Sequence, residues 1–292
     1  MRFFLLVLVL LTGLFAATSG FAMQSLVATR TAAAPQIDGD EADACWQQAG
    51  SVIVHDVVAN IDIVLKAVHD GENIYMLAEY PDADESRLHR ALVWKPELKS
   101  YQNGPTREDA LVLKWSMSGT DADLTLKSDR PYRADIWYWK AHRTDHAGFA
   151  DDKIQHYTTT RDKKSLLLLS KSGKVFYLLR KGDSGASAYK PKLQTAYTED
   201  QVAKYDLVTP EGSRADVRAK GHWQDGRWVI EFARKLDTGH DDDLQMALDG
   251  HYRFGVSRYE IAGRQPELEG ESDTPLFGSG EVGELLQLSF QP

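Results

Sequence analysis

Cysteine is nearly absent from this 292-residue chain, which contains only Cys45. A single cysteine cannot form a disulfide within the chain, and thiolate clusters for zinc or iron–sulfur are excluded as well. No CxxCH motif occurs, so covalent attachment of a c-type haem is excluded too. Cys45 lies next to Trp46 and is expected to be a small, buried, apolar residue.

Motifs for common catalytic chemistry are also missing. The chain has no G-x-S-x-G nucleophile elbow and no HExxH pair, and its nine histidines show no metal-ligand spacing on one strand face. The acidic runs Asp151-Asp152 and Asp241-Asp242-Asp243 are candidates for calcium binding. For the second run we favour an acidic turn that caps a following helix. The sequence therefore indicates a protein that is not an enzyme in its own right.

Long apolar runs are confined to the N-terminus. Arg2 precedes an apolar stretch that extends from Phe3 to Ala17, and small residues follow up to Ala22. This pattern predicts a signal peptide over residues 1–22 and export to the periplasm; an uncleaved anchor is the alternative. No later segment approaches the roughly 20 apolar residues that span a bilayer, so no stable membrane insertion is expected after cleavage.

The chain has fewer basic residues than acidic residues. The chain has 34 Lys and Arg against 43 Asp and Glu, a net charge of −9. We see no basic cluster in the sequence. This balance argues against nucleic acid and against an anionic membrane surface as partners.

Helical periodicity is scarce, whereas short strand-like segments are frequent. Only residues 86–94 and 241–249 are expected to be helical, together with one helical turn in residues 42–50. Hairpin turns are predicted at Asp70-Gly71-Glu72 and at Gln224-Asp225-Gly226, each between two apolar runs. Many short strands separated by turns predict an all-β fold, an antiparallel β-sandwich with a few short helices.

The same pattern suggests a simple domain organisation. We expect a flexible lead over residues 23–35 and a single sandwich domain over residues 36–292. Residues 182–209 are polar and rich in turns, without clear alternation. They predict a long excursion from the sandwich rather than a domain boundary.

The segment ADIWYWKAH combines aromatic rings with a lysine. In a strand, Trp137 and Trp139 share one face, and Tyr138 and Lys140 share the other. One interpretation places the Trp face in the core, with Lys140 paired to an acid. The other makes the Trp face the lining of a pocket for a flat apolar ligand.

Five segments together resemble the ethylbenzene-dehydrogenase-related haem-binding domain. This is the gamma-subunit type found with dimethyl-sulfoxide-reductase-class molybdoenzymes, and its fold is similar to family 9 carbohydrate-binding modules. The resemblance implies one non-covalent b-type haem and electron transfer between a partner enzyme and a periplasmic carrier. The segments are IDGDEADACWQQA, REDALVLKW, ADIWYWKAHRTDHAGFADD, GHWQDGRWVIEFARKLDTGHDDD and YRFGVSRYE.

The resemblance also implies axial ligands, a Met and a Lys, or a His in some relatives. Met117 follows the REDALVLKW strand, where the family's Met falls. The family's second ligand comes late in the chain, but no Lys or His follows His251 here, and the corresponding loop reads AGRQPELEG. Many relatives also have a His where this chain has Tyr138. The remaining donors are Lys140, Lys220 and His222.

Of these donors, His222 needs the least change in pKa to be neutral near pH 7. The predicted haem site therefore comprises Met117 and His222 as iron ligands, with Trp137, Trp139, Lys140 and Lys220 around the cofactor. The expected function is electron transfer by an exported haem b protein, serving a molybdoenzyme or a periplasmic or membrane cytochrome. The alternative is a haem-free module that binds a carbohydrate-like ligand.

Overall fold

The computed structural model describes residues 23–56, 60–259 and 281–292 and shows an antiparallel β-sandwich. The expected signal peptide and the AGRQPELEG loop lie outside these residues. The expected fold class is confirmed. None of the helices in the described ranges is long and apolar enough to span a membrane.

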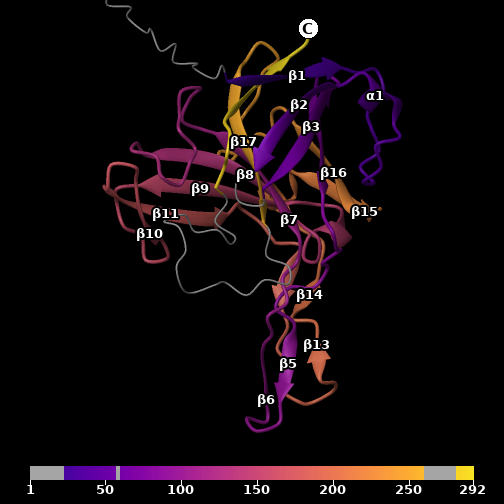
Figure 1. Ribbon diagram of the computed structural model, residues 1–292, viewed down its shortest axis with the longest axis vertical. Coiled ribbons are helices and arrows are strands. Elements are labelled where there is room, and N and C mark those ends of the chain that lie inside the picture. Colours follow the sequence, from indigo (N-terminus) through magenta and orange to yellow (C-terminus); the bar gives the residue numbers. More distant parts are fainter. Residues whose placement is uncertain (1–22, 57–59, 260–280) are drawn as a thin grey trace, which may run out of the picture.

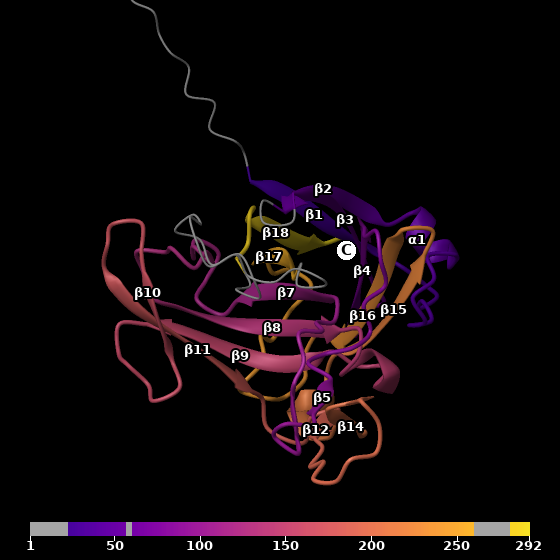
Figure 2. The same ribbon diagram turned by 60° about the horizontal axis from the view of Figure 1, so that its bottom comes forward.

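One continuous path of paired strands folds into two layers (Figures 1 and 2). The first layer consists, in order, of β10 (Leu166–Leu169), β11 (Val175–Gly182), β9 (Asp151–Thr158), β8 (Tyr132–Lys140), β7 (Ala110–Ser116), β17 (Tyr252–Tyr259) and β18 (Leu286–Phe290). The second consists of β2 (Gly50–Asp56), β3 (Ile61–His69), β4 (Asn73–Pro81), β16 (Arg227–Lys235) and β15 (Arg218–Gln224). The main hydrophobic core receives side chains from both layers.

The first strand, β1 (Gln24–Arg30), joins the two layers. Its first five residues pair in parallel with β18, and Thr29 and Arg30 pair in parallel with β3. The flexible lead expected over residues 23–35 is therefore wrong for this strand. Leu26 and Ala28 point into the core and are fully buried, which fixes the strand in place.

Both predicted hairpins are confirmed. Residues 70–72 connect β3 to β4, and Asp225 and Gly226 connect β15 to β16. Asp225 has φ 53° and Gly226 has φ 78°, which is the left-handed conformation that a two-residue hairpin turn requires. The predicted helical turn is also present, as α1 (Ala44–Gln47), where Cys45 is only partly buried.

The two longer helices are not formed. Residues 86–91 are irregular and lead into β5 (Leu92–Lys95), and residues 241–249 form turns. The acidic run at 241–243 therefore caps no helix. The other helical elements of the described chain are two 3₁₀ turns, η1 (Asp145–Ala147) and η2 (Gly212–Ala215).

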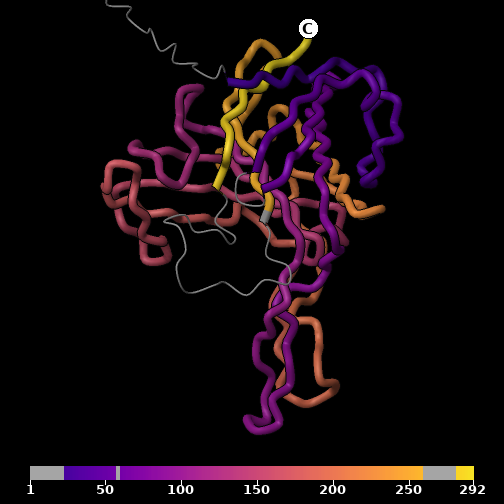
Figure 3. Tube along the Cα trace, viewed as in Figure 1, coloured from indigo at the N-terminus to yellow at the C-terminus, as the bar shows by residue number. Residues whose placement is uncertain are grey.

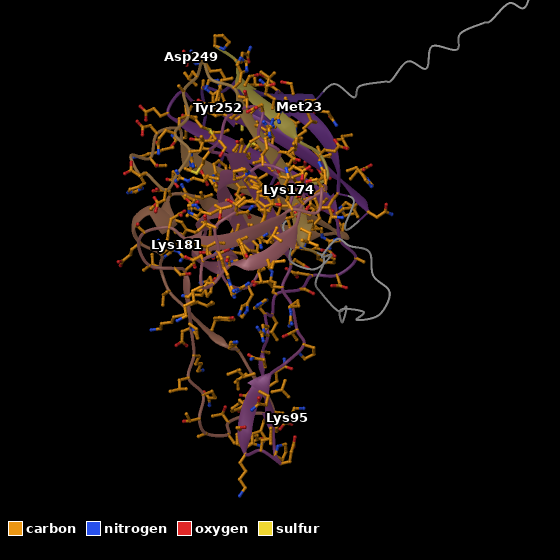
Figure 4. All side chains as sticks on the ribbon, turned by 90° about the vertical axis from the view of Figure 1, so that its left-hand side faces the viewer. Met23, Lys95, Lys174, Lys181, Asp249 and Tyr252 are labelled. Atoms are coloured by element: carbon orange, nitrogen blue, oxygen red, sulfur yellow. The ribbon has the colours of Figure 1, made fainter. Side chains whose placement is uncertain are left out.

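An arm projects from the sandwich and is built from two segments that lie far apart in the sequence (Figure 3). Its strands are β5, β6 (Ser100–Asn103) and β13 (Gln201–Val202), and a ribbon of β12 (Tyr189–Pro191) and β14 (Tyr205–Leu207). Lys95 lies near its far end (Figure 4). The expected excursion over residues 182–209 forms half of this arm, and Tyr189 and Tyr205 reach the candidate site described below.

A buried carboxylate explains the IDGDEADACW segment. Glu231 on β16 is fully buried. One of its oxygens accepts a hydrogen bond from Trp46 Nε1 at 2.7 Å, and the other accepts the backbone N–H groups of Asp38 at 3.0 Å and Gly39 at 2.8 Å. Glu231 thus holds the turn and α1 against the second layer.

Replacing Glu231 with glutamine should destabilise the fold by about 1–3 kcal/mol, because the new amide NH₂ must face at least one buried N–H donor. Urea unfolding of the mature protein would measure this loss. Glu72→Gln, at an exposed position in the β3–β4 turn, is the matched control. Equal midpoints for the two variants would contradict the role given to Glu231.

Candidate functional site

Trp137 and Trp139 belong to the core. Both are fully buried on one face of β8, opposite Tyr138, as the alternation predicted. Trp137 packs against Trp115, with ring centroids 5.0 Å apart, and Trp139 packs edge-on against Trp228 at 4.8 Å. Other side chains therefore occupy the space that a porphyrin would need along this face.

Each of three tryptophans donates its indole N–H to a buried carboxylate. Trp139 bonds to Asp145 at 2.9 Å, Trp228 to Asp109 at 3.1 Å and Trp46 to Glu231. These acids come from the motifs that carry the family resemblance. The motifs are thus needed, at least in part, to build the sandwich.

Lys220 is held by the same network. Its Nζ donates to the backbone oxygen of Asp145 at 3.1 Å and to Asp145 Oδ2 at 3.2 Å. His222, two residues later on β15, is exposed beside a small hollow of about 90 Å³. Pockets that bind small molecules usually measure about 300–1,000 Å³. The hollow beside His222 is therefore too small for a haem.

Lys140 is buried at the end of β8, in an ion cluster centred on Asp151. Asp151 also pairs with Lys153 and Arg214, and it accepts the hydroxyl of Tyr189 at 3.1 Å. Burial lowers the pKa of Lys140 to about 8, against the opposing effect of the Asp151 charge. Burial alone would raise the pKa of Asp151, but the three cations hold it well below its usual range. Pairing of Lys140 with an acid, one of the two interpretations of this strand, is confirmed.

Met117 lies just beyond the end of β7 that is farther from Lys140. It follows Ser116, which pairs with Ala134, whereas Lys140 pairs with Ala110 at the start of β7. Seven residues of extended strand span roughly 23 Å, far more than two ligands of one iron allow. Lys220 bonds to Asp145, just beyond Lys140, and His222 lies on the same strand as Lys220. The structure therefore does not bring Met117 together with Lys140, Lys220 or His222.

His89 is the described residue that best fits an iron ligand. Its Nδ1 lies 3.3 Å from Oε1 of Glu108, a carboxylate that is almost fully buried. A metal-binding histidine commonly has one ring nitrogen next to a carboxylate and ligates through the other nitrogen. Burial, followed by the positive charge of nearby Arg143, lowers the pKa of His89 to about 2, so the imidazole is neutral.

Cations and aromatic rings surround His89. Tyr205 of the arm lies with its ring centroid 6.1 Å from that of His89, and the Arg143 guanidinium is 5.5 Å from the Tyr205 ring. Positive charge from Arg90 and Arg107 also acts on His89. In a protein with a net charge of −9, this is a local positive field suited to carboxylate groups of a planar ligand.

Sequence reasoning missed His89 because it lies in residues 86–94, which were expected to form a helix. Its backbone N–H donates to Nδ1 of His142 at 3.1 Å, and the backbone N–H of His142 donates to Glu108 at 2.9 Å. These contacts join segments that are 53 and 34 residues apart in sequence. Local periodicity carries no signal for such a contact.

A polar groove lies elsewhere on the sandwich, over β9 and β11. Two adjoining hollows of about 680 and 640 Å³ share His156, Lys181 and Gly182 as lining residues. Lys181 is labelled in Figure 4. This volume and lining suit a polar small molecule better than a porphyrin.

Comparison with known proteins identifies the family. The family model described as ethylbenzene dehydrogenase matches residues 40–266, more than three quarters of the chain. The chain therefore belongs to this family, and the resemblance seen in its motifs is confirmed. A comparison with curated proteins gives no match.

Three solved structures are similar over most of their length. A putative carbohydrate-binding protein from Bacteroides uniformis is 12% identical, with TM-score 0.39, over 92% of this chain and 100% of that chain. A family 9 carbohydrate-binding module from Caldicellulosiruptor kristjanssonii with cellotriose is 10% identical, with TM-score 0.35, over 92% and 95%. The module with glucose is 13% identical, with TM-score 0.37, over 90% and 96%. All three TM-scores are below 0.5. The fold is therefore assigned from the strand pairing of this chain and not from these three structures.

Proposed function

We propose that the protein is an exported, non-catalytic haem b protein that transfers electrons, alone or as a subunit serving a periplasmic molybdoenzyme. Membership of the ethylbenzene dehydrogenase family supports this function. The observation that carries it is the state of His89, a neutral imidazole whose Nδ1 is directed to a buried carboxylate. A bound haem would supply reversible one-electron chemistry.

The residues around His89 would have separate tasks. Glu108 would fix the ring orientation and the tautomer, leaving Nε2 of His89 for the iron. Arg90 and Arg107 would attract the propionates, and Tyr205 would cover part of the porphyrin edge. Met117, the ligand implied by the resemblance, lies too far away to share this iron with His89, since β7 separates it from Glu108.

Hemin titration tests this proposal. We expect mature protein, residues 23–292, to shift the Soret band and to give a sharp reduced α band. His89→Ala should weaken hemin binding about 10–100-fold and change the α band, because the iron loses a ligand. His146→Ala is the matched control, since His146 is a nearby exposed histidine whose Nδ1 lies 3.1 Å from the His142 backbone oxygen.

Met117→Ala distinguishes the two candidate ligands. If Met117→Ala changes the α band while His89→Ala does not, the ligand implied by the resemblance is right and His89 is wrong. Absence of any Soret shift in folded protein would contradict haem binding altogether. The haem-free binding module would then be favoured, with its ligand in the groove over β9 and β11.

A further inference from the structure

Four aspartates that are distant in sequence converge beside the core. Asp135 on β8 and Asp152 on the neighbouring β9 point to the same face as Trp137. Asp183 directly follows β11, and its backbone N–H donates to the backbone oxygen of Asp152 at 3.3 Å. Asp243 comes from the loop after β16. All four are buried, with exposed fractions of 0%, 0%, 6% and 4% in this order.

These carboxylates lack the partners that buried charges need. Among the described residues, neither oxygen of Asp183 or Asp243 has a hydrogen-bond partner, and one oxygen each of Asp135 and Asp152 also has none. Arg234 lies beside the cluster, and its Nη1 pairs with Asp135 at 2.5 Å, whereas His240, which lies near Asp243, pairs with Asp216. Four acids against one guanidinium leave three negative charges uncompensated, and buried charges are normally paired or coordinate metals.

The electrostatics of the cluster agree with this deficit. Burial, followed by the charge of Asp135, raises the pKa of Asp183 to about 8 and that of Asp243 to about 7. The same causes raise the pKa of Asp152 well above its usual range.

We propose that Asp135, Asp152 and Asp243, with Asp183 beside them, bind one calcium ion. Carboxylate oxygens of Asp135, Asp152 and Asp243 all lie within 4.8 Å of one another. Oxygens that each lie about 2.4 Å from one ion are at most about 4.8 Å apart, so this spacing fits a shared Ca²⁺. Calcium accepts six to eight oxygens from a cage of carboxylates, whereas Mg²⁺ usually keeps several waters.

The surrounding loops suit this role. Asp242 holds the 241–243 turn in place by accepting the Ser184 N–H at 2.8 Å and the Ser213 hydroxyl at 2.7 Å. Asp183 also lines the 640 Å³ hollow, which gives an ion a route from the surface. The acidic run Asp241-Asp242-Asp243 thus supplies one ligand and one support for the ligand loop, in place of the expected helix cap.

The experiment uses haem-free mature protein stripped with EDTA, so its result does not depend on the proposed haem function. Isothermal titration should show one Ca²⁺ bound per chain. Calcium at about 100 times its dissociation constant should raise Tm by roughly 5–10 °C. Magnesium should bind at least about tenfold more weakly.

Two aspartate-to-asparagine variants separate a ligand from a merely structural acid. Asp243→Asn should weaken Ca²⁺ binding at least about tenfold, yet the stripped variant should be as stable as stripped wild type or more stable, because an amide places no ionisable acid in the buried cluster. Asp241→Asn, at an exposed neighbouring position, should keep wild-type affinity. Absence of a calcium response in stripped, folded protein would overturn the proposal, and so would unchanged affinity in Asp243→Asn. Equal binding of Mg²⁺ would overturn the assignment to calcium.

Discussion

Asp151→Asn is expected to destabilise the protein by about 3–5 kcal/mol, the usual cost of removing one partner from a buried ion pair. Asp151 is the carboxylate that Lys140, Lys153 and Arg214 share. Asparagine keeps the shape of the side chain but leaves three cations without their counter-charge. Thermal unfolding should show a Tm lower by roughly 10 °C for a chain of this size.

Two comparisons make this prediction specific. Asp121→Asn removes an acid from an exposed pair with Arg130 and should leave Tm unchanged. Lys140→Met should cost less than Asp151→Asn, because Asp151 keeps Lys153 and Arg214 as partners. If Lys140→Met proved the more damaging change, Asp151 would not be the centre of the cluster.

The local parts of the fold could be predicted from the sequence. The turn at Asp225-Gly226 has the residue types that positive φ favours, and alternation in ADIWYWKAH placed Trp137 and Trp139 on one face, which the structure shows to be the core face. Both signals act within a few residues, where steric and burial effects dominate. The helix expected at 241–249 failed because tertiary contacts of this loop outweighed its weak helical propensity.

The candidate site depends on contacts that local patterns do not encode. Met117 and His222 were paired as ligands without knowledge of the fold, in which Met117 follows β7 of the first layer and His222 lies on β15 of the second. Conversely, the contact of His89 with Glu108 joins an irregular segment to the start of β7. The four aspartates of the proposed calcium site likewise come from four separate segments.

Gly221 occupies one of the tightest points of the sandwich. A Cβ added there would lie 2.4 Å from Cζ2 and 2.9 Å from Cε2 of Trp139. The Trp139 ring cannot retreat easily, because it is fully buried, bonded to Asp145 and packed on Trp228. Alanine normally stabilises a strand relative to glycine, but the close contact with Trp139 should make alanine destabilising at this position.

Gly221→Ala should therefore destabilise the protein by about 2–4 kcal/mol, because a methyl group is forced against a ring that has no room to move. Chemical unfolding of the single variants and of the double variant with Trp139→Leu would measure this effect as a double-mutant cycle. The smaller leucine leaves space for the methyl group, so Gly221→Ala should cost much less in that background, although Trp139→Leu is itself destabilising. An equal cost in both backgrounds would show that the glycine is required for another reason than its contact with Trp139.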